Sequence, residues 1–245
     1  MESTIYDHIG TTYEANRGSD PAISSEIARS LGVSESVINV GAGTGSYEPV
    51  DRFVLAVEPS IEMIKQRDDR AAPVVQGRAE ALPVASRSFD AALAVLTLHH
   101  WSDVTTGLTE LARVAQDRVV VLTWDPSVTS FWLYDYFPEI LEIDVSIFPS
   151  ITDIERSLGN VETATIPIGH ACADGFLGAY WRRPEQYLDP KIRSGMSTFS
   201  KISGTASGVR QLESDLNGGT WLRKHRHLLR EETLDLGYRL LVCEI

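Results

Sequence analysis

The stretch VINVGAGTGSYE, residues 37–48, decides the fold, because three glycines follow directly after a short β-branched run. A strand that ends in glycines and turns toward a helix exposes backbone N–H groups, and a ligand can closely approach backbone that lacks Cβ atoms. The dinucleotide-binding fingerprint has the order G-x-G-x-x-G/A, whereas Gly41, Gly43 and Gly45 alternate with single residues and Ser46 takes the last position. The pattern predicts a nucleotide-binding turn, with an ordinary glycine turn as the alternative.

The next predicted strand adds an acidic residue to this loop. FVLAVEPS, residues 53–60, contains Glu58 at its end, where a carboxylate can accept hydrogen bonds from both ribose hydroxyls of a nucleoside. Glu58 follows Gly41 by 17 residues, against about 20 in the nucleotide-binding βαβ pattern. The shortfall is about one helical turn, and Pro49 falls where the helix interior would lie. We therefore expect Glu58 to contact the ribose and the first crossover helix to be a stub that starts near Ser46.

Composition excludes several classes of function. The chain has 245 residues and a formal net charge of −12, which argues against broad nucleic-acid or anionic-membrane binding because both need a cationic face. The longest apolar run, residues 91–98, is far shorter than a membrane span, and MESTIYDHIG shows no signal-peptide pattern. Cys172 and Cys243 lie far apart, without metal-ligand spacing. We expect a cytoplasmic protein with no metal site and no membrane insertion.

Short apolar runs alternate with helical segments along the first half of the chain, which predicts βαβ units and a parallel sheet in one domain. Helices are expected in residues 19–32, 60–67, 102–116 and 151–159, with Ser19 or Asp20, Ser60 and Ser102 as caps. Strands are expected at Val37–Val40, Phe53–Val57, Val74–Gln76, Ala91–Leu96, Val119–Thr123, 161–168 and 238–245.

Four blocks of sequence together resemble the class I S-adenosylmethionine-dependent methyltransferases, in the group similar to the ubiquinone and menaquinone methyltransferases. They are VINVGAGTGSYE (37–48), LAVEPSIEMI (55–64), QGRAEALPVASRSFDAALAVLTLHHW (76–101) and RVVVLTWD (118–125). The third block is the most specific, since it joins G-x-A-E-x-L-P to a strand that H-H-W closes.

The resemblance implies a fold and a cofactor. The fold is α/β, a Rossmann-like three-layer αβα sandwich with a mixed seven-stranded sheet and an antiparallel last strand. The cofactor is S-adenosyl-L-methionine. One domain would consist of an N-terminal helical cap (1–35), a cofactor-binding core (36–125), and a segment of substrate-covering helices with the last two strands (126–245).

The resemblance also implies roles for individual residues. The glycine loop would pass along the methionine part and the ribose of the cofactor, Glu58 would hold the ribose hydroxyls, and Arg17 would pair with the cofactor carboxylate or lie exposed. Asn39 departs from the family pattern, where an acidic residue is usual, and so does Arg78, where an aspartate often meets the adenine. The implied cofactor-binding residues are Tyr13, Arg17, Gly41, Ala42, Gly43, Gly45, Glu58, Pro59, Ala79, Glu80 and Leu96.

Methyl transfer from a sulfonium is an in-line displacement with an activated leaving group, so the main task of the protein is to orient the acceptor. A base is needed only if the acceptor must lose a proton. His99 and His100 follow the fourth strand, where an α/β sheet opens its ligand crevice, and histidine titrates near neutral pH. Either histidine is a candidate catalytic base; the alternative is that both only pack, against Trp101 or along the pocket.

Aromatic and basic residues of the second half are candidates for binding a small-molecule acceptor. FWLYDYF (131–137) contributes Trp132 and Tyr136, and HACADGFLGAYWRRP (170–184) contributes His170 and Arg182. The alternatives are core packing for the aromatic residues and surface exposure for the arginine.

These features together predict a methyltransferase that uses S-adenosylmethionine to methylate oxygen, nitrogen or carbon of a small molecule, with a homodimer left open. One alternative is an NAD-dependent oxidoreductase, although the chain lacks the G-x-G-x-x-G order. Another is a non-catalytic module that binds the cofactor.

Overall fold

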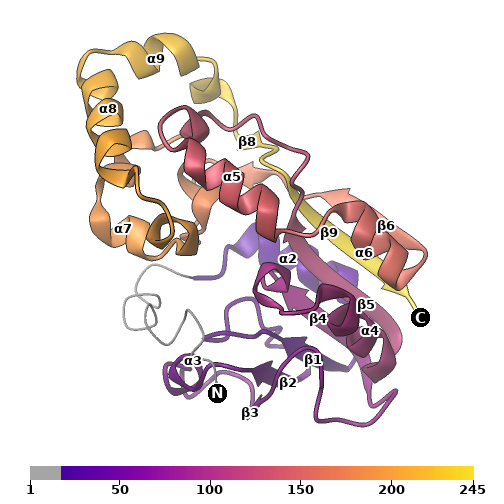
Figure 1. The fold of residues 1–245 in the computed structure, drawn as a ribbon. Helices are drawn as coiled ribbons and strands as arrows, with labels where there is room; N and C mark the ends of the chain where they lie inside the picture. The colour runs from indigo at the N-terminus through magenta and orange to yellow at the C-terminus, as the bar shows by residue number, and fades with distance from the viewer. Residues whose placement is uncertain (1–17) are drawn as a thin grey trace.

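A mixed sheet of seven strands forms the centre of the computed structural model, which describes residues 18–245 (Figure 1). The strand order is β3-β2-β1-β4-β5-β9-β6. Strands β1 to β5 pair in parallel, and β9 is inserted antiparallel between β5 and β6, which confirms the predicted sheet. The strands are β1 (Ser36–Val40), β2 (Phe53–Glu58), β3 (Val74–Gln76), β4 (Phe89–Val95), β5 (Ala115–Trp124), β6 (Val161–Thr165) and β9 (Tyr238–Glu244).

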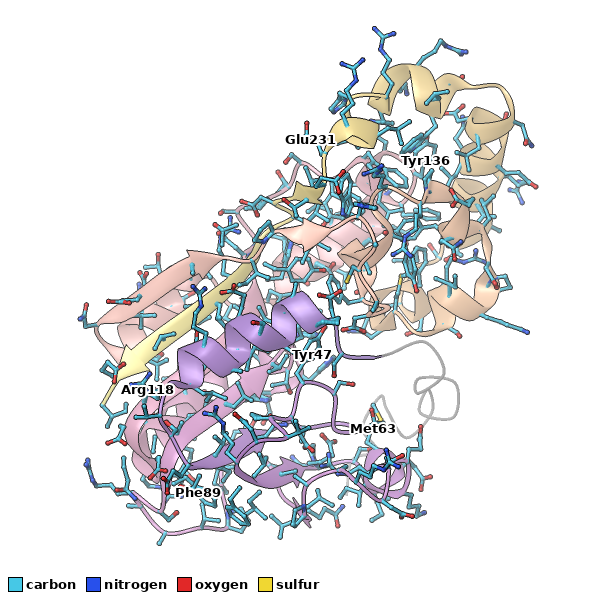
Figure 2. All side chains as sticks on the ribbon, turned by 180° about the vertical axis from the view of Figure 1, so that it is seen from behind. Tyr47, Met63, Phe89, Arg118, Tyr136 and Glu231 are labelled. Carbon is cyan, nitrogen blue, oxygen red and sulfur yellow. The ribbon has the colours of Figure 1, made fainter. Side chains whose placement is uncertain are left out.

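Helices cover both faces of this sheet, because side chains alternate between the faces along each strand. In β4, Leu93 joins the core cluster under α2 (Pro21–Leu31), whereas Ala94 joins the cluster on the opposite face. That face is covered by α4 (Val104–Val114) and α6 (Ile151–Leu158). The fold is therefore the predicted three-layer sandwich, and Figure 2 shows α2 lying across its side of the sheet.

The remaining helices gather beyond the carboxyl ends of the parallel strands, where α5, α7, α8 and α9 form a lobe (Figure 1). Within residues 18–245, no helix combines the length and the apolar character needed to cross a bilayer. The other elements are α3 (Ile61–Lys65), α5 (Pro138–Ile147), α7 (Pro190–Ser194), α8 (Thr205–Asn217), α9 (Thr220–His225), the ribbon of β7 (Ile168–Gly169) and β8 (Thr233–Leu234), and the 3₁₀ helices η2 (Leu98–His100), η3 (Trp132–Asp135), η4 (Leu177–Tyr180), η5 (Pro184–Leu188), η6 (Ser197–Ser200) and η7 (Leu228–Arg230).

Side chains that accept backbone hydrogen bonds fix the starts of the helices. Asp20 caps α2 and Ser60 caps α3, as predicted. The predicted cap of α4 is wrong: Asp103 accepts the N–H bond that starts this helix, because Ser102 instead donates to Glu80.

The connection between β1 and β2 contains no helix. Residues 41–52, all of which the structure describes, form turns and loop, so the predicted stub near Ser46 is wrong. All three glycines of this loop and Tyr47 have positive φ, which a right-handed helix cannot include. The segment before β1 supplies α2, which covers this side of the sheet in place of a crossover helix.

Candidate active site

The glycine loop leaves β1 at the carboxyl edge of the sheet, and its glycines have different surroundings. A Cβ added at Gly41 would overlap the Thr97 side chain, so this glycine lets the loop pack against the end of β4. A Cβ added at Gly43 would meet no atom of the described residues within 4 Å, and its φ is 55°. The bare backbone of Gly43 is therefore where a ligand can approach, and the loop fits a nucleoside cofactor.

Glu58 ends β2 beside this open backbone and is only 5% exposed. Its Oε2 accepts the Gly43 N–H at 2.8 Å, and its Oε1 accepts the Ser60 N–H at 2.8 Å. An ionised carboxylate has about four acceptor positions. The same carboxylate thus fixes the loop and the start of α3, at the place where the sequence predicts a ribose contact.

A buried ion pair holds the loop in the absence of a crossover helix. The Arg67 Nη2 lies 2.6 Å from Oε1 and 2.8 Å from Oε2 of Glu48, and the two side chains are 4% and 7% exposed. Arg67 Nη1 also donates to the Gly43 carbonyl at 3.0 Å. Sequence reasoning missed this pair, since Arg67 follows α3 like an ordinary surface arginine and Glu48 lies in a segment expected to be helical.

Two predicted adenine contacts have structural partners. Ala79 is buried in the core cluster under α4, and Glu80 Oε1 accepts from both the Ser102 backbone N–H and the Ser102 Oγ at 2.7 Å. Burial raises the pKa of Glu80, but the hydrogen bonds from Ser102 and Asp103 outweigh it and lower the pKa overall. Glu80 therefore holds the start of α4, and its contact with adenine stays a prediction.

The other predicted cofactor contacts surround the loop or fall outside the described residues. Ala42 is buried and donates its N–H to the Val57 carbonyl at 3.2 Å. Gly45 packs beside the ion pair, and Pro59 follows Glu58 at the edge of the sheet. Tyr13 and Arg17 lie outside the described residues.

The end of β4 carries the two candidate bases. Leu96 leaves the strand with a φ of 50°, a conformation that is rare for a bulky residue and that surrounding structure must enforce. The His99 ring stacks on Phe148 with centroids 4.1 Å apart, and the His100 ring centroid lies 3.8 Å from that of His99. The chain thus turns sharply and presents both imidazoles beyond the sheet.

A cavity of about 70 Å³ lies beside the two histidines, between the ends of β4 and β5 and the helical lobe. Its polar lining consists of His99, His100, Asp144, Ser197 and Thr198. Its aromatic, aliphatic and glycine lining consists of Leu96, Trp124, Phe131, Tyr134, Phe148, Phe176, Leu177, Gly178, Met196, Leu236 and Tyr238. The size suits one end of a small molecule.

The four residues predicted to contact the acceptor do not line this cavity. Trp132 is buried and donates its Nε1 to the Trp181 carbonyl at 2.8 Å. Tyr136 donates its hydroxyl to Asp215 at 2.9 Å, within the helical lobe (Figure 2). His170 Nε2 lies 3.1 Å from a Glu232 oxygen, and Arg182 donates to the Glu231 carbonyl at 2.9 Å. Each of the four side chains has a partner away from this cavity, and their contact with the acceptor stays a prediction.

Asp144 is the one acidic residue among the described residues of the cavity lining, and sequence reasoning missed it. It is 4% exposed, and its Oδ1 accepts from Thr198 Oγ1 at 2.9 Å. Burial raises the pKa of Asp144 to about 6, although the bond from Thr198 and the positive charge of Lys201 act in the opposite direction. The spacing of residues in the sequence could have revealed it. Asp144 follows the buried Ile140 by four residues on α5, so the two side chains share one helix face and a carboxylate lies on the buried side.

Asp144→Asn is expected to stabilise the protein above about pH 6, by up to roughly 3 kcal/mol at 1.36 kcal/mol per pKa unit. The folded pKa lies above the ordinary value of 3.8, so the unfolded chain loses its proton first and stability falls as pH rises from about 4 to 6. Asparagine keeps an oxygen for Thr198 and carries no charge. Chemical denaturation at several pH values checks this, with exposed Glu142→Gln on the same helix as the control. A gain independent of pH would contradict the assignment.

Comparisons with known proteins bear on this site. Residues 38–122 match the family model described as a methyltransferase domain. A crystal structure from Anabaena variabilis, described as a candidate methyltransferase from an antibiotic biosynthesis pathway, is 31% identical. The match covers 92% of this chain and 98% of that one, with a TM-score of 0.86. This chain belongs to the class I S-adenosylmethionine-dependent methyltransferases. S-adenosyl-L-methionine is therefore its cofactor, which confirms the prediction over the NAD alternative.

Two further relatives show how far the similarity extends. Demethylmenaquinone methyltransferase of Corynebacterium kroppenstedtii is 34% identical over 86 residues, which span 34% of this chain and 38% of that relative. The [4+2]-cyclase SpnF is 14% identical with a TM-score of 0.59, over 98% of this chain and 93% of that one. The second likeness shows the fold alone, so the acceptor must be inferred from the site.

Proposed function

We propose that this methyltransferase acts on a small molecule held in the cavity beside His99 and His100. The observation that supports this is the contact between the cofactor loop and the histidine turn. Gly41 packs on Thr97, and Thr97 immediately precedes η2, which carries both histidines. A cofactor along the loop would thus lie next to the cavity, at the carboxyl ends of β1, β2 and β4, where α/β sheets bind ligands.

In this proposal the chain divides its tasks by segment. Residues 36–125 bind the cofactor, with the open backbone of Gly43 along its methionine part and Glu58 on its ribose. Gly41, Ala42 and Gly45 shape the loop, and Leu96 borders the cofactor and the cavity. Residues 126–245 cover the acceptor, and residues 1–35 form the N-terminal cap, including the predicted contacts from Tyr13 and Arg17.

The bound cofactor supplies a methyl group that its sulfonium already activates. The protein then has to orient the acceptor atom and keep water out, and the aromatic wall of the cavity serves both needs. Where the acceptor atom carries a proton, one ring nitrogen of His99 or His100 accepts it. The stack of His99 on Phe148 fixes the orientation of one ring.

His99→Ala and His100→Ala are expected to separate a base from a bystander. Loss of a general base lowers kcat by about 10²–10⁴-fold and changes the pH profile, whereas loss of a packing residue mainly raises KM. The assay follows transfer of an isotope-labelled methyl group from S-adenosylmethionine to a panel of small amines, alcohols and phenols. His227→Ala, at an exposed position of the helical lobe, is the control. If both variants keep the wild-type kcat at every pH, neither histidine is the base.

A further inference from the structure

We infer that the acceptor carries a protonated amine, and that the Asp144 carboxylate binds this amine inside the aromatic cavity. The inference rests on the proposed function, since it takes the cavity beside His99 and His100 as the acceptor pocket. It adds the chemical class of the acceptor of this chain, which the fold does not specify.

The charges around the cavity favour a cation. Asp144 is the one acidic residue among the described residues of the lining, and that lining includes no lysine or arginine. Within residues 18–245, its Oδ1 accepts from Thr198 and its Oδ2 has no hydrogen-bond partner. Lys201 lowers the pKa of Asp144 through space but forms no ion pair with it in this part of the chain. An ammonium group could therefore donate to the carboxylate directly.

The walls of the cavity suit the same ligand. Six aromatic side chains line it: Trp124, Phe131, Tyr134, Phe148, Phe176 and Tyr238. The faces of aromatic rings attract cations but withhold solvation from a carboxylate. An ammonium group with its alkyl substituents is attracted both by the rings and by the charge of Asp144. A neutral group is attracted only weakly by that charge, and an anionic group is repelled by it.

The basic residues that would suit an anionic acceptor are engaged elsewhere. Arg182 donates to the Glu231 carbonyl, and Arg183 donates to the carbonyls of Cys172 and Ala179 at 2.9 Å. Neither arginine lines the cavity. A carboxylate-bearing acceptor would therefore place its charge against Asp144 without a compensating arginine from the described part of the lining.

The chain has a carboxylate at position 144, where an uncharged amide would make the folded protein more stable. Burial opposes ionisation of Asp144, yet the hydrogen bond from Thr198 needs only an oxygen that accepts. A buried group whose charge opposes folding, in a cavity, is characteristic of a functional site. A bound ammonium would supply a countercharge in direct contact with Asp144, which residues 18–245 do not provide.

The test measures binding of propylamine, butylamine and benzylamine, each against the alcohol of the same carbon skeleton. Ligand-observed NMR titrations are made at about pH 8, where the amines are protonated and Asp144 is ionised, with and without S-adenosylhomocysteine. In the wild-type protein at least one amine should bind about tenfold or more tightly than its alcohol. Asp144→Asn should reduce that preference to less than about threefold, and Glu142→Gln on the exposed side of α5 should leave it unchanged.

The outcomes separate this inference from the proposed function. S-adenosylhomocysteine binding is measured independently by calorimetry for each variant, so its failure counts against the cofactor site alone. Equal binding of amines and alcohols, binding of neither class, or an amine preference that Asp144→Asn retains would overturn the inference.

Discussion

Glu58→Gln is expected to weaken binding of S-adenosylmethionine by roughly 100-fold, or about 3 kcal/mol. Two hydrogen bonds from the ribose hydroxyls to a charged acceptor contribute about 1.5 kcal/mol each. Glutamine replaces one oxygen by an NH₂ group, which would face the N–H of Gly43 or of Ser60 as a second donor. Calorimetric titration of the wild type and the variant measures the difference.

The loop and ribose effects of Glu58 can be separated with a second ligand. An analogue of S-adenosylhomocysteine that lacks the 2′ and 3′ hydroxyls should bind wild type and Glu58→Gln with similar affinities, apart from the loop effect. Asp69→Asn removes an exposed carboxylate after α3 and serves as the control. If both proteins discriminate against the analogue equally, Glu58 does not hold the ribose.

Arg67→Met is expected to lower the free energy of unfolding by about 3–5 kcal/mol. Methionine fills much of the same space but leaves the Glu48 carboxylate, whose side chain is 7% exposed, without its charged partner. A buried charge that loses its partner is costly, because the protein no longer compensates for its lost hydration. Urea denaturation compares this variant with Arg70→Met, which removes an exposed arginine three residues later.

A double-mutant cycle tests whether the pair itself is responsible. Glu48→Gln combined with Arg67→Met leaves no buried charge at the site, so the double variant should lose less stability than the two single changes added together. A loss for Arg67→Met no greater than that for Arg70→Met, or strictly additive effects, would show that the ion pair does not hold the loop.

The sequence predicted the sheet because local signals and the family pattern agree there. Alternating apolar residues bury both faces of β1, β4 and β5, and the terminal strand pairs on both sides with β5 and β6. The connection after β1 was mispredicted, because spacing alone does not show that an arginine after α3 will reach back to Glu48. The cap of α4 was misplaced by one residue, since Ser102 and Asp103 are both good caps and only the contact of Ser102 with Glu80 decides between them.

The two halves of the site differ in how far sequence could predict them. The loop and Glu58 follow from contiguous motifs, so their positions were predicted, although their contacts with the cofactor stay predictions. The cavity is assembled from the turn after β4, from η2, β5, η3 and α5, and from the segments around η4, η6 and β9. Aromatic residues within one short segment diverge there: Phe131 and Tyr134 line the cavity, whereas Trp132 packs in the core. Such a division depends on tertiary packing, which spacing did not reveal.

A crystal structure of the complex with S-adenosylhomocysteine would show where the cofactor lies relative to Glu58 and the cavity. We expect the ribose hydroxyls to lie within hydrogen-bonding distance of Glu58, the amino-acid part to run along Gly43, and the sulfur to face the cavity bordered by His99, His100 and Asp144. A nucleoside bound away from Glu58, or a sulfur directed away from that cavity, would contradict it.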